Sequence, residues 1–360
     1  MIVPFDNFRA TEGASPSRLG DLDHSPLYYK RRKEASEEEK SVYMSFGSMV
    51  DCLLTTPGQF ENEYYVSSGV LPSDSIKAVI DGVYSELEGN FNGIFTGLEE
   101  FSEKIVEHSK YLNYGQSWKE ATLIKKILDS GSDYFSELIS SAGKEIISPE
   151  DYDQAMSCAE ALQTNDFTKE YFRNDFVVSA DAPTEVLFQV PLVWTEAGYV
   201  CKGLVDVLFV DHNDKSITIV DLKTTAKSVY AFEHSYIKYR YYLQGGLYHS
   251  GVKDLVTLSD PFPNYTVKNP LFVVIEQRGG NPPFIFEMSD EDLRVAKWGG
   301  RIGSSNRVIK GYLELLNDLN WHQTSDIWDY PRYVHGCKGV IQLNAFNSEG
   351  IQISVKMDEK

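Results

Sequence analysis

Two carboxylates and a lysine lie within one short stretch of the sequence, residues 203–223, which reads G-L-V-D-V-L-F-V-D-H-N-D-K-S-I-T-I-V-D-L-K. Two apolar runs flank a His-Asn-Asp turn, a pattern typical of a β-hairpin. Side chains alternate across a strand, so Asp221 and Lys223 point to the same face. In a hairpin closed over this turn, Asp206 of the first run lies near Asp221. Such a group could hold a hard divalent cation and the phosphate that it polarises.

The alternative is that these residues have no chemical role. An Asp-x-Lys tripeptide at the end of a strand occurs often by chance, and it is then a solvated edge or turn. Asp206 favours the functional interpretation, because a carboxylate inside the apolar run V-D-V-L-F is costly to bury without a partner.

The composition predicts a soluble globular protein. The 360 residues are 42% hydrophobic and 24% charged, which fits one elaborated domain or a core with a large insertion. The start of the chain, M-I-V-P-F-D-N-F, has no basic stretch before an apolar one, so no signal peptide is expected, and no apolar run is long enough to span a membrane. The four cysteines are scattered without a C-x-x-C, which argues against a disulfide framework, a zinc ribbon and an iron–sulfur cluster and favours a reducing cytoplasm.

The net charge of −19 argues against a protein that coats DNA non-specifically, because phosphate binding favours a basic surface. DNA could still be held in a local basic channel. The alternative for any basic cluster is a solvated face, and this is the favoured interpretation for the cluster nearest the N-terminus. The two clusters are Lys30, Arg31, Arg32 and Lys33, and, around the hairpin, Lys223, Lys227, Lys238 and Arg240.

The first part of the chain predicts two helices. Ser15 or Ser17 can cap a short helix that has Pro16 in its first turn. A second helix is expected over residues 45–56, because a proline follows it and its apolar residues keep helical spacing. Asp51 lies at the edge of that apolar stripe, where an ordinary boundary residue is the alternative to a functional one.

Residues 69–147 have the apolar spacing of helices and are interpreted as a helical insertion. Residues 148–164 form a further helix, since a serine cap is followed by proline and then by a carboxylate three positions on. The other predicted elements are strands at 185–194 (in which Pro191 indicates an edge or a bulge), 199–210, 216–222, 270–276 and 284–286, and a long amphipathic helix at 289–319.

Residues 236–249, Y-I-K-Y-R-Y-Y-L-Q-G-G-L-Y-H, are predicted to form one helix after the hairpin. Arg240, Gln244 and Tyr248 are four residues apart and so share one face of it. Each of the two glycines after Gln244 costs a helix about 1 kcal/mol relative to alanine, so their presence predicts close approach to the sheet.

This order of elements predicts an α/β fold with a mixed sheet flanked by helices. A doubly wound dinucleotide-binding fold is excluded, because no G-x-G-x-x-G follows a strand. An NTPase of the phosphate-loop type is also excluded, because the sequence has no G-x-x-x-x-G-K-[ST].

The chain resembles the PD-(D/E)xK nuclease superfamily, and more closely the RecE, or exonuclease VIII-type, exonucleases often carried by phages. The matching segments are F-G-S-M-V-D-C-L-L-T-T-P, G-L-V-D, I-V-D-L-K-T-T and Y-R-Y-Y-L-Q-G-G-L-Y, with weaker matches at I-E-Q-R-G-G-N-P-P and W-D-Y-P. They lie between Ser15 and Pro331. The combination of D-L-K-T-T with Q-x-x-x-Y is specific, whereas any single segment is weak.

The resemblance implies a restriction-endonuclease-like core with a helical insertion. It implies that Asp206 and Asp221 are metal-binding carboxylates, that Lys223 is the catalytic lysine, and that the carbonyl of Leu222 is a further metal ligand. Gln244 matches the helix residue that orients lysine, water or DNA. The implied cofactor is Mg²⁺, with Mn²⁺ as the other candidate.

The resemblance implies roles for four further residues, Asp51, Tyr248, Ser17 and Arg18. Arg240, from the basic cluster around the hairpin, is a further candidate. Asp51 stands where the closest relatives have histidine in G-x-x-x-H, and an aspartate is still a good oxygen ligand for Mg²⁺ or Mn²⁺. Tyr248 completes the Q-x-x-x-Y pattern. Ser17 and Arg18 match an S-x-S-[RK]-L element that contacts phosphate. We therefore expect Ser17, Arg18, Arg240 and Tyr248 to contact DNA.

On this interpretation the whole chain, 1–360, is a single nuclease domain. Residues 1–68 form the first part of the core, 69–147 the insertion, 148–335 the catalytic core and 336–360 a C-terminal tail. The resemblance implies a metal-dependent 5′→3′ exonuclease that acts on linear double-stranded DNA and leaves 5′-phosphates. Such an enzyme would work in recombination beside a single-strand annealing protein, as a cytoplasmic homo-oligomer with no membrane contact.

Two alternatives remain open on the sequence. One is a structure-specific endonuclease or a repair nuclease of the same superfamily. The other is a non-catalytic DNA-binding module that keeps the fold without the activity.

Overall fold

The computed structural model describes residues 1–34, 46–87, 97–173, 183–258, 262–302 and 308–341. Most of the predicted C-terminal tail therefore lies outside the described residues. The chain divides into two compact units, the first made of residues 1–55 and 158–360 and the second of residues 56–157. All the residues predicted to do chemistry belong to the first unit.

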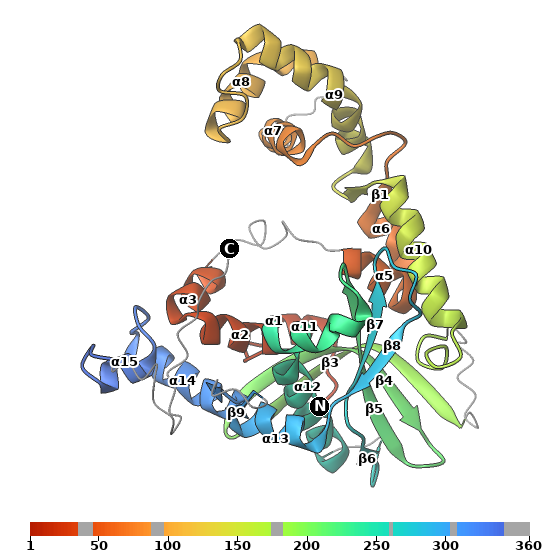
Figure 1. Ribbon diagram of the computed structural model, residues 1–360, viewed down its shortest axis with the longest axis vertical. Helices are drawn as coiled ribbons and strands as arrows, with labels where there is room; N and C mark the ends of the chain where they lie inside the picture. Colours follow the sequence, from red (N-terminus) through yellow and green to blue (C-terminus); the bar gives the residue numbers. More distant parts are fainter. Residues whose placement is uncertain (35–45, 88–96, 174–182, 259–261, 303–307, 342–360) are drawn as a thin grey trace. The chain divides into compact units, whose positions relative to one another are not determined.

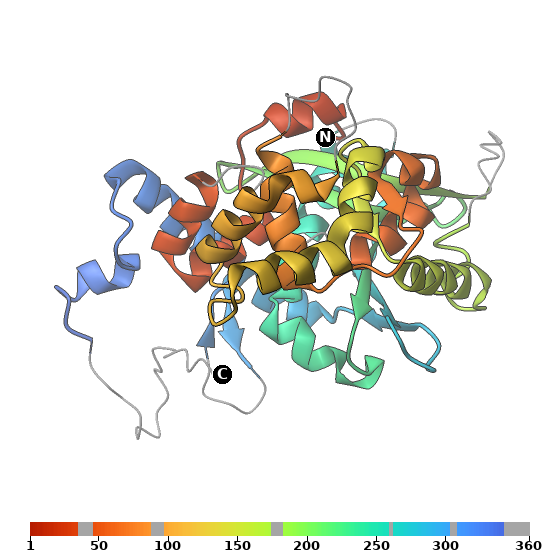
Figure 2. The same cartoon turned by 90° about the horizontal axis from the view of Figure 1, so that it is seen from above.

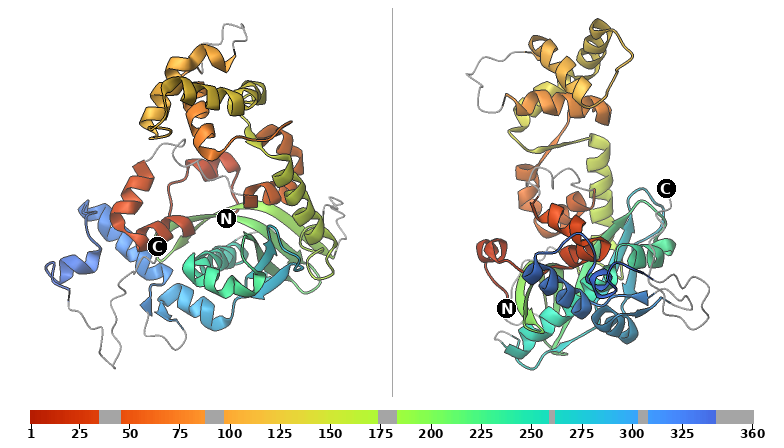
Figure 3. Two further views of the ribbon diagram at one scale, coloured as in Figure 1. Left: turned by 45° about the horizontal axis from the view of Figure 1, so that its top comes forward. Right: turned by 90° about the vertical axis from the view of Figure 1, so that its left-hand side faces the viewer.

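The first unit is built on a sheet of six strands, which is mixed as the sequence predicts (Figure 1). β5 is central, and its residues 216–222 are buried without alternation, as expected for a strand covered on both faces. β3 and β4 form a long hairpin (Figure 3), and Pro191 lies in β3 at the edge of the sheet. The strand order is β3 (Thr184–Glu196), β4 (Tyr199–Asp211), β5 (Ser216–Thr225), β7 (Leu271–Glu276) and β8 (Phe284–Glu287), and β6 (Thr266–Val267) also pairs with β5. Among the described pairs of this sheet, β5–β7 and β5–β6 are parallel and the others are antiparallel.

Helices surround this sheet. α12 (Tyr241–Leu258) packs against β3, β4 and β5, and α5 (Phe46–Thr55) packs against β5. α2 (Pro16–His24) begins at Ser15, whose hydroxyl accepts a hydrogen bond from the Arg18 N–H. The remaining helices of this unit are α1 (Phe5–Ala10), α3 (Pro26–Glu34), η3 (Val229–Ala231), α11 (Phe232–Lys238), α13 (Asp290–Trp298), α14 (Tyr312–Ser325) and α15 (Arg332–Gly336).

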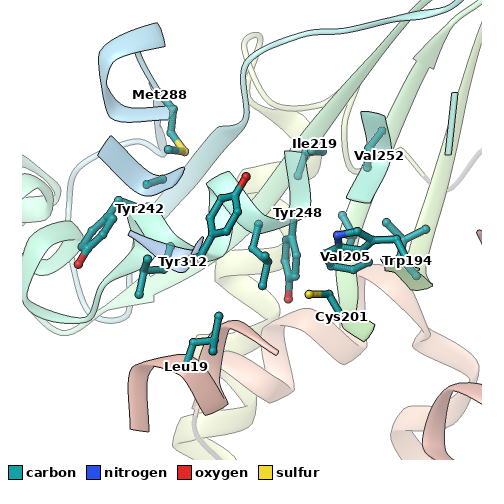
Figure 4. Packing of buried hydrophobic residues seen from close by; sticks show 14 of the residues in the cluster. Leu19, Trp194, Cys201, Val205, Ile219, Tyr242, Tyr248, Val252, Met288 and Tyr312 are labelled. Atoms are coloured by element: carbon teal, nitrogen blue, oxygen red, sulfur yellow. The ribbon is translucent and has the colours of Figure 1, made fainter. Parts of the chain in front are cut away.

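The core of the first unit lies between α12 and the sheet, and Figure 4 shows part of it. Glycines bring α12 close to its neighbours. A Cβ at Gly245 would collide with Met288 and contact Phe272 of β7, so this glycine allows the predicted approach to the sheet. A Cβ at Gly246 would instead collide with Ala296, so the second glycine makes room for α13.

Gly203 of β4 packs against the ring of the buried Tyr248 on α12. We expect Gly203→Ala to lower the free energy of unfolding by about 1–3 kcal/mol, because the added methyl would push the helix away from the strand. Urea unfolding would measure the loss. Gly20→Ala is the matched control, because no atom lies within 4 Å of its added Cβ and alanine is the better helix former. Equal unfolding midpoints for the two variants would contradict the close packing.

The second unit is largely helical and contains the predicted insertion. α7 (Asp74–Ser85), α8 (Ser102–Tyr111) and α9 (Glu120–Ser141), coloured orange to yellow in Figure 2, share a core that includes Ile80, Ile127 and Phe135. A parallel pair of strands, β1 (Tyr64–Val66) and β2 (Glu145–Ile147), contacts α6 (Phe60–Glu63) and α9. Two further short helices are η1 (Pro57–Gln59), which contacts α6, and η2 (Leu98–Phe101), which contacts α8 and α9. α10 (Pro149–Thr164) begins in this unit after the predicted Ser148 cap and ends in the first. In the described parts of the chain, every helix is too short or too polar to cross a membrane.

Two predicted helices are interrupted in the structure. The predicted helix 289–319 starts with a capping box at Ser289 but ends at Gly299, whose φ of 80° is left-handed. Two short strands, β9 (Gly300–Arg301) and β10 (Val308–Ile309), then precede α14. The predicted helix 236–249 is divided into α11 and α12 at Arg240, whose φ is 59°. A single left-handed residue ends a helix, and a pattern of apolar spacing does not reveal it.

Candidate active site

Asp206 lies at the point where β4 and β5 stop pairing. The last pair of their ladder is Val207 with Val220, and Asp206 and Asp221 are the next two residues in that register. The Asp206 Oδ2 atom accepts a hydrogen bond from the Leu222 N–H at 2.9 Å. The side chain of Asp206 thus replaces the ladder partner that β4 no longer provides. β5 meanwhile continues to pair with β7 on its other side.

Asp221 is the centre of the cluster and is only 1% exposed. Its Oδ1 atom accepts a hydrogen bond from Gln244 Nε2 at 2.7 Å, and its Oδ2 atom forms an ion pair with the Lys223 ammonium. The same ammonium lies 4.9 Å from the centroid of the Tyr241 ring, within the range of a cation–π interaction. The structure therefore gathers Asp206, Asp221, Lys223 and Gln244 in one place.

Burial changes the pKa values of the charged groups in this cluster. The pKa of Asp206 is raised well above its ordinary value by burial and then by the charge of Asp221, with a smaller contribution from Asp51. Burial also raises the pKa of Asp221, although Lys223 opposes the shift. For Lys223 burial would lower the pKa, but the two carboxylates outweigh it and leave the pKa above its ordinary value. One lysine does not compensate the negative charge around Asp206.

The donors of the cluster fit a hard divalent cation. Carboxylates and a backbone carbonyl are the oxygen ligands that Mg²⁺ and Mn²⁺ prefer, and Asp206, Asp221 and the Leu222 carbonyl supply them. The raised pKa of Asp206 marks a buried charge that a cation would stabilise. Across the described residues, however, no three or more His, Cys, Asp and Glu side chains are grouped so that they could hold a metal ion. Asp51 is thus not gathered with Asp206 and Asp221 around one point.

Asp51 instead has a partner that the sequence analysis missed. Its Oδ2 atom accepts a hydrogen bond from Gln189 Nε2 at 2.7 Å, which joins α5 to β3. Gln189 belongs to no motif. The signal in the sequence that could have indicated a functional role is its polarity within the apolar run E-V-L-F-Q-V-P-L-V-W. Tyr241 was missed in the same way, since its role depends on the fold of the α11–α12 junction.

A cavity of about 780 Å³ lies beside the cluster, between α2, β4 and the start of α12. Gln244 and Tyr241 line it, and these two residues also contact Asp221 and Lys223. The lining includes three basic side chains, Lys202, Lys238 and Arg240, one carboxylate, Asp21, and the further aromatic rings of Phe8, Tyr28 and Tyr239. In a chain of net charge −19, this combination of cations and rings is suited to phosphates and bases.

The four residues predicted to contact DNA lie in different positions relative to the cavity. Ser17 lines the cavity and is exposed, whereas Arg18 does not line it and lies over the Tyr29 ring, 5.8 Å from the centroid. Arg240 lines the cavity, but it precedes α12 and pairs with Asp23, so it does not share a helix face with Gln244 as predicted.

Tyr248 is a core residue with one edge on the cavity. Burial raises the pKa of its phenol, and the charges of Asp206 and Asp221 raise it further. The side chain of Gln244 lies beside this phenol and partly opposes the rise of its pKa. Tyr248 is thus a neighbour of the amide that holds Asp221.

Comparisons with known proteins add little to this geometry. No protein-family model matches the chain, and no curated protein is similar to it in sequence. Among solved structures, the crystal structure of a candidate exonuclease from Eubacterium rectale has a TM-score of 0.44 and 11% identity, with 95% of each chain covered. At this TM-score the likeness decides neither family nor activity.

Proposed function

We propose that this protein is a metal-dependent deoxyribonuclease that hydrolyses the phosphodiester bonds of DNA. The observation that carries the proposal is the position of Gln244. This residue hydrogen-bonds the buried Asp221 and at the same time lines a cavity with basic and aromatic walls. A substrate in that cavity would place a phosphate next to two carboxylates and a lysine. These are the groups that a metal-dependent hydrolysis of a phosphodiester requires.

Each residue of the cluster has a role in this proposal. Asp206, Asp221 and the Leu222 carbonyl would hold a Mg²⁺ or Mn²⁺ ion, which when bound polarises the scissile phosphate and lowers the pKa of a water molecule. The Lys223 ammonium donates to a phosphoryl oxygen as negative charge develops there. Gln244 keeps the Asp221 carboxylate in one orientation.

The cavity wall would bind the DNA. Lys202, Lys238 and Arg240 can neutralise backbone phosphates, and the rings of Tyr239 and Tyr241 can stack on bases. We further propose, from the resemblance of the sequence to RecE-type enzymes, that the substrate is linear double-stranded DNA degraded from 5′ to 3′. On the same basis the protein would act as a homo-oligomer beside a single-strand annealing protein in recombination.

An assay with labelled DNA tests this proposal. Linear duplexes labelled at either the 5′ or the 3′ ends are incubated with Mg²⁺, with Mn²⁺ or with EDTA, and a closed circular duplex is the control. We expect early release of short 5′-labelled products, slow shortening of the 3′-labelled strand, and no cleavage in EDTA or of the circle.

The other outcomes distinguish the rival functions. Cleavage of the closed circle would indicate an endonuclease, and early loss of the 3′ label would reverse the polarity. Binding to linear duplex without cleavage in either metal would contradict the enzyme and favour a DNA-binding module. Light scattering of the purified protein would test the proposed homo-oligomer separately.

A further inference from the structure

Gln189 lies at an interruption in the β3–β4 ladder, directly beside the candidate active site. The ladder pairs Phe188 with Val207 and Val190 with Val205, and the register places Gln189 opposite Asp206 between these pairs. The φ of Gln189 is 49°, in the left-handed region that residues other than glycine rarely adopt in a strand. Unusual backbone of this kind persists where the surrounding structure holds it, and it concentrates at functional sites.

The side chain of Gln189 reaches away from its strand to another element. Its Nε2 atom donates to Asp51 Oδ2 at 2.7 Å, so β3 is joined to α5 across 138 residues of sequence. A hydrogen bond to a carboxylate is stronger and more directional than one between neutral groups. Gln189 therefore contacts Asp51 through its side chain while its backbone lies opposite Asp206.

Asp51 belongs to α5, which packs against β5, the strand that carries Asp221 and Lys223. Asp51 itself is not grouped with Asp206 and Asp221 as a ready-made third ligand. The Gln189 amide, which belongs to β3 and not to the cluster, donates a hydrogen bond to this third carboxylate.

We propose that Gln189 is a positioning residue of the active site, which fixes Asp51 relative to Asp206 and so sets the affinity of the site for its metal. This inference rests on the proposed metal-dependent function. The partners of groups around a metal site, although they do not touch the metal, typically change its affinity 10–100-fold when they are removed. A merely structural Gln189 would change stability and leave metal affinity unaltered.

Calorimetric titration of the metal-free protein with Mn²⁺ and Mg²⁺ tests the proposal. We expect Gln189→Ala and Gln189→Gly to bind both metals about 10–100-fold more weakly than the unmodified protein. Gln189→Gly should unfold at a higher temperature than Gln189→Ala, because glycine adopts the left-handed φ without strain. Gln323→Ala, an exposed change on α14, is the matched control and should bind as the unmodified protein does.

Two results would overturn the inference. One is equal or tighter metal binding by Gln189→Ala, and the other is retained binding by Gln189→Gly with loss in Gln189→Ala, which would assign the effect to the backbone alone. Because Gln189→Gly removes the strain, it remains informative if Gln189→Ala does not fold.

A double-variant cycle isolates the route through Asp51. If Gln189 acts by holding Asp51, adding Gln189→Ala to Asp51→Ala should weaken metal binding no further. Losses that add independently would contradict this route. Failure of the unmodified protein to bind either metal would instead contradict the proposed function, so the two failures are distinguishable.

Discussion

Lys223→Ala is expected to lower the rate of cleavage of linear duplex DNA by about 10²–10³-fold, the usual cost of removing one group that stabilises the charge of a transition state. The ammonium is held by Asp221 on one side and by the Tyr241 ring on the other, so it is fixed before substrate arrives. End-labelled duplex with saturating Mg²⁺ would measure the rate. Lys125→Ala is the control, since Lys125 is an exposed lysine on α9 that belongs to neither basic cluster.

The same variant is also expected to lose stability. The sequence alone suggests that a lysine at a strand end contributes little to folding, but Lys223 is the charge partner of a buried carboxylate. Removing one member of a buried pair typically costs about 3–5 kcal/mol, because the other charge is left without compensation. Urea unfolding of the metal-free variant would measure this cost.

Lys223→Arg separates the two roles of the lysine. A guanidinium keeps the positive charge beside Asp221 but lacks the compact ammonium, so stability should largely return while cleavage remains low. Normal cleavage by Lys223→Ala would remove Lys223 from the chemistry. Normal cleavage by Lys223→Arg would show that any positive charge suffices there.

The sheet and its carboxylates could be predicted because short patterns determine them. Side-chain directions alternate along any strand, so Asp221 and Lys223 share a face of β5, and the turn between β4 and β5 fixes the register that brings Asp206 opposite Asp221. The mixed character of the sheet followed from the order of the elements along the chain, whereas the order of the strands within the sheet did not. These features depend on residues that are close in the chain.

The rest depends on contacts between distant residues or on single backbone angles. The left-handed Arg240 splits a helix whose side-chain pattern is continuous, because the pattern reports burial and not φ. The bond between Gln189 and Asp51 joins residues that no local pattern relates. Lys202 reaches the cavity from β4, where its sequence neighbours give no sign of a substrate.

The sequence and the structure also differ on Asp51. The resemblance implies a third carboxylate ligand, whereas the structure places Asp51 against Gln189 and outside a three-acid group. The two carboxylates that do meet, Asp206 and Asp221, must therefore carry most of the charge that a cation would neutralise. Changing one of these two should have the clearest effect on stability.

Asp206→Asn is expected to stabilise the metal-free protein while abolishing cleavage. The raised pKa of Asp206 means that folding disfavours its charged form, by burial first and by Asp221 second. Asparagine has the same shape and keeps an oxygen that can accept from the Leu222 N–H, so the strand end should not open. We expect a gain of about 0.5–2 kcal/mol, the range of single stabilising substitutions.

With metal bound, the unmodified protein should become more stable than Asp206→Asn. A cation that binds the folded protein stabilises it by mass action, so Mg²⁺ should raise the unfolding temperature of the unmodified protein and leave that of Asp206→Asn almost unchanged. Thermal unfolding with and without Mg²⁺ measures both effects, and duplex cleavage is followed on the same samples. Asp214→Asn, an exposed change in the turn of the same hairpin, should alter neither. If metal-free Asp206→Asn were less stable than the unmodified protein, the buried charge would not be a cost to folding, and the main reason for placing a cation beside Asp206 would be lost.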